Sequence, residues 1–324
     1  MKMHMVQAIN NCLFQEMERD ESILVMGEDV GVDGGVFRVT DGLYDKFGRE
    51  RVIDTPLSEA GIVGTALGMA TLGLRPVAEI QFQGFVFNAY HHLVQHAARL
   101  RNRTRGKFTV PMVVRMPYSG NVNALEHHSE SMESPFIHIP GLIVLCPASP
   151  YDAKGLLASA LKAKDPVMFF EPKRLYRAFK EDVPEERYEI PIGKASVLRE
   201  GSDLTLVSWG AMTYVSSKAV EKAEENGISV EQIDLRSLSP CDYETIHESV
   251  KKTGRCVVVH EAVKTLGFGA EISARIMEKD LLRLEAPVKR VTGWDITIPY
   301  PKTEEYFFPD EKRILEGIEE TVNF

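Results

Sequence analysis

Short apolar runs alternate along this chain with stretches whose apolar residues recur at helical spacing. This alternation is typical of α/β domains, in which helices join the parallel strands of a sheet. The strand-like runs of the first half are residues 22–26, 52–53, 76–82, 112–115, 142–146 and 166–171. Helical patterns occupy about residues 5–17, 61–72 and 87–101, and another helix opens at residue 149. The pattern predicts a parallel α/β domain over residues 1–176.

The same alternation returns after a polar segment. Residues 177–192 are charged and carry no apolar periodicity, as expected of a linker. Strand-like runs then occupy residues 204–208, 230–234, 256–260 and 288–291. Helical patterns lie between them, at residues 213–225, 243–252 and 268–279. Residues 193–324 are therefore predicted to form a second parallel α/β domain, and two domains are what 324 residues favour at about 150 residues each.

Composition excludes several classes of protein. Hydrophobic residues make up 44% and charged residues 26%, which is ordinary globular usage and not that of a disordered or collagen-like chain. The 38 Lys and Arg against 47 Asp and Glu give a net charge of −9, which argues against a protein that mainly holds nucleic acid. The apolar runs are far shorter than the roughly 20 residues of a membrane span, and the N-terminal helix is amphipathic, unlike a signal peptide. We expect a cytoplasmic protein.

The cysteines indicate neither a disulfide framework nor a zinc site. They lie far apart and form no CxxC pair. The four residues are Cys12, Cys146, Cys241 and Cys256. Buried free thiols are the expectation.

Glycines at three- and four-residue spacing, Gly61, Gly64 and Gly68, share one face of the helix predicted at residues 61–72. Their missing side chains allow another helix or a ligand to approach the backbone closely, and helix packing alone explains them as well. Glu59 at the start of this helix complements the helix dipole. In its apolar setting the carboxylate would also be desolvated and its pKa raised, so that it could share a proton with a bound heterocycle.

Two groups of histidines are candidates for function. His127 and His128 lie together in a polar loop after a strand, where adjacent histidines are either exposed or functional. His92 and His96 have the i, i+4 spacing of a metal-binding pair, with His91 beside them. No glutamate base stands between them and no third ligand is obvious, so a metal site is not the favoured interpretation.

His260 and Glu261 end the strand predicted at residues 256–260. The carboxyl ends of strands are where α/β domains place their sites. A structural hydrogen-bonding role is an equally open interpretation of both residues.

Long motifs stand in one order along the chain. They are Gly27-Glu28-Asp29-Val30-Gly31, Gly34-Gly35-Val36-Phe37-Arg38, Asp54-Thr55-Pro56-Leu57-Ser58-Glu59, Glu79-Ile80-Gln81-Phe82, His128-Ser129-x-Ser131, residues 150–157 and Glu261-Ala262. In these motifs the chain resembles, over essentially its full length, the β chain of the thiamine-diphosphate-dependent decarboxylating component of 2-oxo acid dehydrogenase complexes. The resemblance implies a transketolase-like pyrimidine-binding domain followed by a transketolase-like C-terminal domain.

Residues 169–177, 200–207 and 209–210 look most like the branched-chain members of this family. The resemblance therefore implies oxidative decarboxylation of a branched-chain 2-oxo acid, in branched-chain amino acid catabolism, with acyl transfer to the lipoyl groups of an acyltransferase. A pyruvate or acetoin dehydrogenase β subunit is the alternative, because the catalytic motifs are shared. An inert scaffold subunit is a third hypothesis, against which the presence of Glu59 and His128 argues.

The resemblance also implies that the chain works with a partner. Members of the family hold the cofactor diphosphate through Mg²⁺ on a Gly-Asp-Gly motif, and this sequence contains no Gly-Asp-Gly. An α chain is therefore expected, in a heterotetramer of two α and two β chains, with the diphosphate on α and the aminopyrimidine on β. The C-terminal domain is expected to support dimerisation and to dock the lipoyl acyltransferase core.

The resemblance also implies roles for particular residues. Glu59 looks like the carboxylate that hydrogen-bonds the aminopyrimidine and promotes its imino tautomer, the base that forms the ylide. Leu57 and Phe85 are implied to shape the pyrimidine pocket, and Glu28 to lie beside the cofactor. His128 is implied to act near the substrate carboxylate and to assist acyl transfer to a lipoyl disulfide.

The sequence departs from its relatives in the acids that line a tunnel between two active sites. Glu28 and Glu59 match that set, but Asn88 and His91 stand where acids often occur. A carboxylate relay would then need His91 as a titrating group.

Two further expectations concern loops. The loop at residues 119–123 has fewer glycines than is usual in the family, which affects the shape of the substrate pocket. The resemblance also implies a monovalent cation, K⁺, on the backbone carbonyls near Ala160, Ala163 and Asp165.

Overall fold

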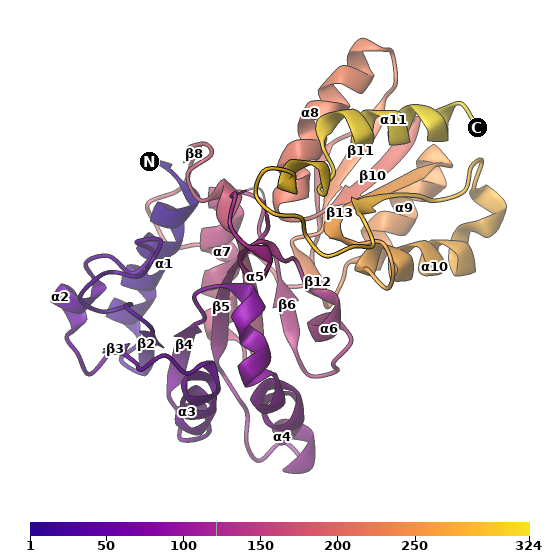
Figure 1. The fold of residues 1–324 in the computed structure, drawn as a ribbon. Coiled ribbons are helices and arrows are strands. Elements are labelled where there is room, and N and C mark those ends of the chain that lie inside the picture. The colour runs from indigo at the N-terminus through magenta and orange to yellow at the C-terminus, as the bar shows by residue number, and fades with distance from the viewer. Residues whose placement is uncertain (121) are drawn as a thin grey trace. The chain divides into compact units, whose positions relative to one another are not determined.

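The computed structural model describes residues 1–120 and 122–324. The chain divides into two compact units, and Figure 1 shows its course by colour. The first unit comprises residues 1–118 and 135–192, and the second comprises residues 119–134 and 193–324. The sixteen-residue segment at 119–134 thus packs with the C-terminal part of the chain. The domains expected from the sequence instead place this segment in the first domain, residues 1–176.

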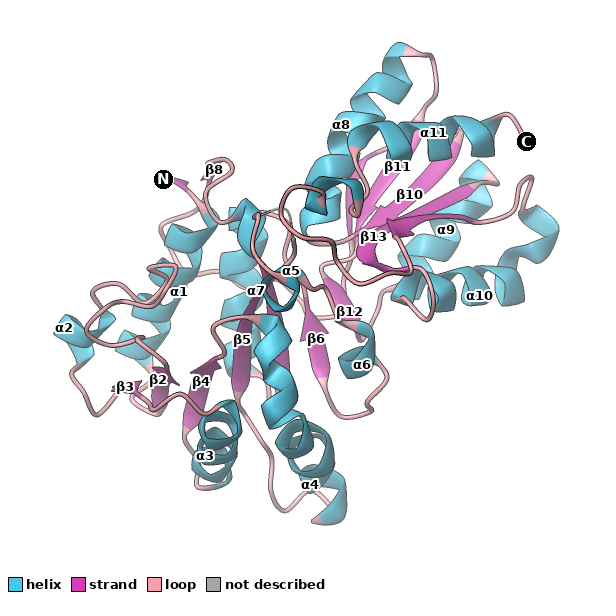
Figure 2. Ribbon diagram, in the orientation of Figure 1, coloured by secondary structure: helices cyan, strands magenta, loops and turns pink. Residues whose placement is uncertain are grey.

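The first unit is built on a parallel sheet. Its strands are β2 (Ile23–Gly27), β3 (Val52–Asp54), β4 (Arg75–Glu79), β5 (Val113–Tyr118), β6 (Ile143–Leu145) and β7 (Val167–Pro172). They lie side by side in the order β6-β7-β5-β4-β2-β3. Every residue of β2, β5 and β7 is buried, so both faces of the sheet are covered, as is usual for parallel sheets (Figure 2).

Helices surround this sheet, and two of them begin with a serine cap. They are α1 (Met5–Arg19), α2 (Leu43–Phe47), α3 (Glu59–Thr71), α4 (Ala98–Arg103), α6 (Ser134–Ile137), α7 (Pro150–Lys162) and the 3₁₀ turn η3 (Lys173–Leu175). Ser58 before α3 and Ser149 before α7 each accept a hydrogen bond from a backbone N–H three residues further on. These caps satisfy amides that have no partner inside the helix, and Pro150 in the first turn of α7 is preorganised for it.

The helix predicted at residues 87–101 is a chain of three different helical segments. A 3₁₀ segment η1 (Gln83–Ala89) leads into a π-helix η2 (His92–Ala97) and then into α4. In a π-helix the hydrogen bonds run from i to i+5. Residues five apart therefore become neighbours, and the ring centroids of His91 and His96 lie 5.0 Å apart. The sequence pattern revealed a helix but not its pitch.

Residues 177–192, predicted as a linker, are attached to the first unit. Their strand β8 (Glu181–Asp182) pairs antiparallel with β1 (Lys2–Met3) at the N-terminus. The buried Lys154 of α7 donates hydrogen bonds of 2.7–3.1 Å from Nζ to three consecutive carbonyls, those of Pro184, Glu185 and Glu186. An ammonium group is held by carbonyl oxygens much as a metal cation is, so this segment is fixed to the helix.

The second unit has its own, mostly parallel sheet. Its strands are β9 (Ser196–Arg199), β10 (Leu204–Ser208), β11 (Val230–Asp234), β13 (Cys256–Val263) and β14 (Lys289–Gly293), in the order β14-β13-β10-β11-β9. Only β9 among these strands is antiparallel to its neighbour. The other elements are α5 (Glu126–Ser129), α8 (Ala211–Glu225), β12 (Ser237–Ser239), α9 (Tyr243–Thr253), α10 (Phe268–Asp280), η4 (Leu281–Arg283), η5 (Glu304–Tyr306) and α11 (Glu311–Val322). The expected α/β architecture is thus confirmed in both halves of the chain.

Helix α11 is an element that the sequence analysis did not predict. Asp310 caps it by accepting the backbone N–H of Arg313, and Ile314 and Ile318 are buried one turn apart. It packs against α8 and β14. The cap and the apolar spacing were signals that could have identified it.

The cysteines are free thiols, as expected. Cys12, Cys146 and Cys256 are buried, whereas Cys241 is half-buried. Burial raises the pKa of the Cys241 and Cys256 thiols to about 12, which keeps both protonated. Across residues 1–120 and 122–324, no helix has the length and apolar character needed to cross a membrane.

A buried ionic network joins three neighbouring strands of the first unit. Arg115 of β5 is fully buried and donates two hydrogen bonds, of 2.6 and 2.8 Å, to the two carboxylate oxygens of Glu171 on β7. On its other side Nη1 donates at 2.6 Å to Glu79, the last residue of β4. The hydroxyl of Tyr176 donates a further hydrogen bond of 2.5 Å to Glu171. Arg115 therefore links its strand to both neighbouring strands.

We predict that Arg115→Met lowers the free energy of unfolding by about 3–5 kcal/mol, because two carboxylates would stay buried without their cation. Urea denaturation of the purified chain measures this. Arg101→Met is the matched control, since it breaks the partly exposed ion pair with Asp165 and should cost about 0–1 kcal/mol. Equal losses in the two variants would contradict the role given to the buried network.

Candidate active site

Glu59 opens helix α3 and is almost completely buried, with 7% of its surface exposed. The preceding Ser58 accepts a hydrogen bond from the N–H of Gly61, so the cap is made by the serine and the glutamate is not needed for it. The Asn88 side chain donates a hydrogen bond of 3.3 Å to Oε2 of Glu59. Asn88, which stands where the family resembled often carries an acid, thus contacts this carboxylate through its amide.

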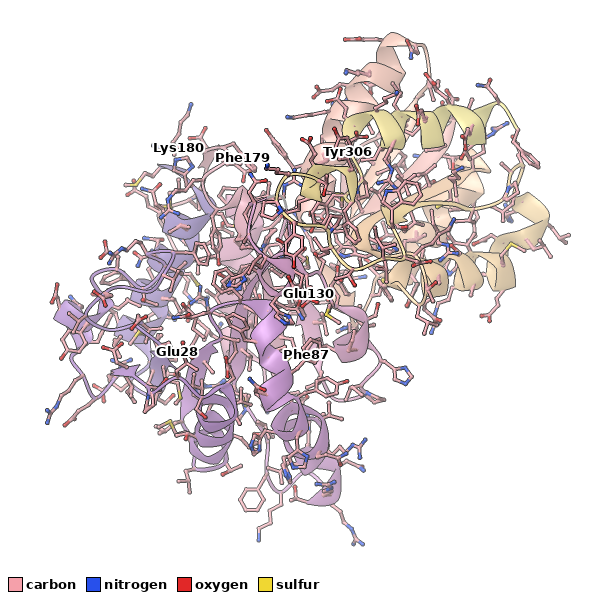
Figure 3. The ribbon with its side chains drawn as sticks, in the orientation of Figure 1. Glu28, Phe87, Glu130, Phe179, Lys180 and Tyr306 are labelled. Carbon is pink, nitrogen blue, oxygen red and sulfur yellow. The ribbon has the colours of Figure 1, made fainter. Side chains whose placement is uncertain are left out.

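Glu28 follows directly after β2 and is a second carboxylate close to Glu59; its side chain is labelled in Figure 3. Burial raises the pKa of Glu28, and the negative charges of Glu59 and then Asp29 raise it further. Two carboxylates that repel each other do not both ionise readily. Glu28 therefore keeps its proton to higher pH than a free carboxyl group does, close to the carboxylate at the start of α3.

The segments before α3 and in η1 carry apolar side chains and polar side chains without hydrogen-bond partners among the described residues. Leu57 is 79% exposed, and the rings of Phe82 and Phe85 meet edge to face at 5.7 Å. Within the described residues, the buried hydroxyl of Thr55 has no hydrogen-bond partner, and neither does the buried amide of Gln83. An exposed leucine, aromatic rings and orphaned polar atoms near a buried carboxylate fit a planar heterocycle that carries hydrogen-bonding nitrogens.

His128 belongs to the second unit. It lies on the short helix α5, and its backbone N–H donates to the carbonyl of Leu125 at 2.9 Å. The neighbouring His127 is exposed and its Nδ1 lies 3.6 Å from the carboxylate of Glu130. Of the loop at residues 119–123, whose low glycine content was noted, Asn121 lies outside the described residues. Glu59 and His128, the two expected catalytic residues, are thus carried by different units.

The rings of His91, His92 and His96 lie close together at the π-helix, but they do not form a group of metal ligands. The rings of His92 and His96 lie 6.0 Å apart and those of His91 and His92 lie 5.5 Å apart. Burial lowers the pKa of His92, and the charges of His91 and His96 lower it further. In the part of the chain that the structure describes, no group of three or more His, Cys, Asp or Glu side chains could hold a metal ion.

Two of the three carbonyl groups expected to bind a monovalent cation, those of Ala160 and Ala163, have partners within the chain. The carbonyl of Ala160 accepts the N–H of Ala163, and that of Ala163 accepts Nη1 of Arg75 at 3.2 Å. The carboxylate of Asp165 pairs with Arg101 at 2.5 Å. The guanidinium of Arg75 therefore already supplies positive charge at the carbonyl of Ala163, and a K⁺ site near these residues stays a prediction.

Both units match known domains. Residues 1–178 match the model described as "Transketolase, pyrimidine binding domain", and residues 193–314 match "Transketolase, C-terminal domain". A solved structure titled "Split gene transketolase, inactive beta4 tetramer" aligns with a TM-score of 0.80 over 99% of this chain and 98% of that chain. At 20% identity this likeness concerns the fold. The fold and the domain matches define a transketolase-like pair of domains.

Comparison with curated relatives identifies the family to which the chain belongs within this class of protein. The chain is 57% identical over 310 residues to the pyruvate dehydrogenase E1 component subunit beta of Acholeplasma laidlawii, over 96% of this chain and 95% of that protein. It is 50% identical to the subunit of the same name from Staphylococcus epidermidis, over 100% of this chain and 99% of that protein. The chain therefore belongs to the family of E1 β subunits of 2-oxo acid dehydrogenases. The names of these relatives favour the pyruvate alternative and give no support to branched-chain specificity.

We predict that Glu28→Gln makes the protein more stable than the wild type by an amount that grows as the pH rises above about 4.5. A raised pKa means that the folded state binds this proton more tightly than the unfolded chain, so wild-type stability falls as Glu28 ionises. Urea denaturation at pH 4 and pH 7 measures the difference.

Glu21→Gln is the control, since Glu21 is exposed on the surface of the same unit. If the stability difference between wild type and Glu28→Gln is the same at both pH values, Glu28 does not have the raised pKa that its burial and its negative neighbours predict.

Proposed function

We propose that this chain is the β subunit of a pyruvate dehydrogenase and provides the aminopyrimidine half of a thiamine diphosphate site. The observation that carries the proposal is the buried Glu59 at the start of α3, with Glu28 beside it, in a domain that matches the transketolase pyrimidine-binding model. Among the relatives reported, those of 50% identity or more carry the name of this subunit.

The residues of the first unit fit the pyrimidine ring of the cofactor. When bound, thiamine diphosphate supplies a nucleophilic carbon and an electron sink for decarboxylation. Glu59 holds a proton at a ring nitrogen, and Asn88 keeps that carboxylate oriented by donating to Oε2. Glu28 limits the negative charge of the pair by keeping its own proton to higher pH. Leu57 and Phe85 exclude water from the ring, which strengthens each of these polar contacts.

His128 is the residue of the second unit that we assign to the substrate. Its imidazole is half-buried and belongs to a helix of one turn. A histidine in this position can hold the substrate carboxylate and pass a proton during acyl transfer to a lipoyl disulfide.

The chain needs an α subunit for activity. It contains no Gly-Asp-Gly motif to hold Mg²⁺ and the cofactor diphosphate, and the exposed Leu57 offers apolar surface for burial. We propose a heterotetramer of two α and two β chains that delivers acyl groups to a lipoyl acyltransferase core. A monovalent cation near Ala160 remains part of this proposal.

The enzyme reconstituted from α and β chains is expected to decarboxylate pyruvate with at least tenfold higher kcat/KM than branched-chain 2-oxo acids or acetoin. Reduction of an artificial electron acceptor measures the first half of the reaction with each substrate. Preference for a branched-chain acid would overturn the pyruvate assignment and restore the branched-chain reading of residues 169–177. Turnover by the β chain alone would contradict the shared site.

Glu59→Gln is expected to abolish decarboxylation, with a loss of at least 10³-fold in kcat, because the amide cannot take and return the proton. The heterotetramer should still assemble, as size-exclusion chromatography would show. Glu244→Gln is the matched control: Glu244 also lies in the first turn of a helix, but it is exposed and pairs with Lys279. Retained activity in Glu59→Gln would contradict the proposed role.

A further inference from the structure

The two ends of the segment that carries His128 are joined by a backbone hydrogen bond. We call residues 119–131 the His128 loop. The backbone N–H of Ser119, at its start, donates to the carbonyl of Glu130 near its end, and the side chain of Glu130 is labelled in Figure 3. Ser119 has φ of +80°, a conformation that non-glycine residues rarely adopt. At the next position a Cβ on Gly120 would lie 1.8 Å from the ring of Phe308, so only glycine fits.

A single carboxylate also joins the two ends of this loop. Oε1 of Glu261 accepts a hydrogen bond of 2.9 Å from the hydroxyl of Ser119, and Oε2 accepts one of 2.8 Å from the hydroxyl of Ser131. All three side chains are buried, and Glu261 is only 3% exposed. Hydrogen bonds to an ionised acceptor are stronger than those between neutral groups, and more so in a dry interior.

A second contact fixes the chain just beyond the loop. The buried indole N–H of Trp209 donates at 2.7 Å to the carboxylate of Glu133. Trp209 is itself stacked on His260, with ring centroids 5.3 Å apart. His260 is fully buried against the start of α10, where a Cβ on Gly269 would lie 2.9 Å from its ring. The residues after the loop are therefore held by a packed aromatic layer that leaves little freedom of movement.

We propose that Glu261 is a positioning residue that clamps both ends of the His128 loop and so sets the place of His128. This inference deepens the proposed function and rests on it. Glu261 comes from the carboxyl end of β13, on the sheet of the second unit, and its partners come from residues 119–131. A rigid strand thus supports a loop that has only one turn of helix of its own.

The chemistry of the clamp explains why a carboxylate is required. Two serine hydroxyls donate to two different oxygens, and an ionised carboxylate offers acceptors on both. A glutamine would keep one acceptor and present an N–H₂ group to the other serine, whose hydroxyl can turn to accept from it. Glu261→Gln should therefore keep much of the clamp, whereas Glu261→Ala removes both contacts.

Hydrogen–deuterium exchange of the reconstituted heterotetramer tests the clamp directly. Glu261→Ala should speed exchange of the amides at residues 122–130 by at least tenfold, and Ser131→Ala should do so by about tenfold, because each lost contact is a hydrogen bond to a charged group. The double variant should exchange no faster than Glu261→Ala alone, because Ser131 then has no carboxylate to hold. Unchanged exchange in Glu261→Ala, or effects of the two substitutions that simply add, would overturn the proposal.

Ser216→Ala is the matched control for these variants. Ser216 is a fully buried serine of the same unit, and among the described residues its hydroxyl has no hydrogen-bond partner. Its loss should leave exchange at residues 122–130 unchanged. Faster exchange in this control would mean that the loop responds to any buried change in the unit, which would overturn the specific role of Glu261.

Measurements of enzyme activity distinguish a role of Glu261 in positioning His128 from a general role in the stability of the unit. Glu261→Ala should lower kcat for acyl transfer at least tenfold in the wild-type background and leave it unchanged in a His128→Ala background, while cofactor affinity stays the same. Glu261→Gln should recover most of the rate. An equal loss in both backgrounds would overturn a role through His128. If the wild-type heterotetramer decarboxylates no 2-oxo acid, the proposed function fails, and the exchange experiment still decides whether the clamp exists.

Discussion

The guanidinium of Arg115, held between two buried carboxylates, is the interaction on which the first unit depends. A buried charge without its partner is costly, so Glu79, Arg115 and Glu171 have one favourable arrangement. That arrangement favours one register of the three adjacent strands β7, β5 and β4. The chain leaves β4 after Glu79 to form the segment that carries Phe85 and Asn88, so this network anchors the strand end from which that segment starts.

Local sequence patterns predicted the strands and most helices, and they placed Glu59 at the start of its helix. These features depend on periodicity and capping within a few residues. Other features depend on which strands become neighbours, and this is why Arg115 and Glu171, 56 positions apart, could not be paired from the sequence. The packing of residues 119–134 with the second unit had no local signal either. Glu261 was noticed at a strand end, but its serine partners were not.

In the proposed function, the two units divide the chemistry between them. The first supplies the carboxylate of Glu59 with Glu28, whose pKa is raised, beside it, and the second supplies an imidazole on a loop held at both ends. Each group is oriented by a neighbour with no reactive role of its own: Asn88 for Glu59, and Glu261 for the loop that carries His128. This supporting layer makes the position of a side chain reproducible, which a loop or a helix terminus alone does not ensure.

The π-helix at His92–Ala97 shows how the number of residues in this segment affects the shape of the helix. Such a turn takes up one residue more than an α-helical turn of the same rise without breaking the helix. Deleting a single codon there would remove the extra residue and restore the α-helical pitch, and α4 would keep nearly the orientation it has now. The arginines that follow, Arg99 and Arg101, would therefore keep their places on the surface. The extra residue changes the helix only within this wide turn, where the rings of His91 and His96 come together.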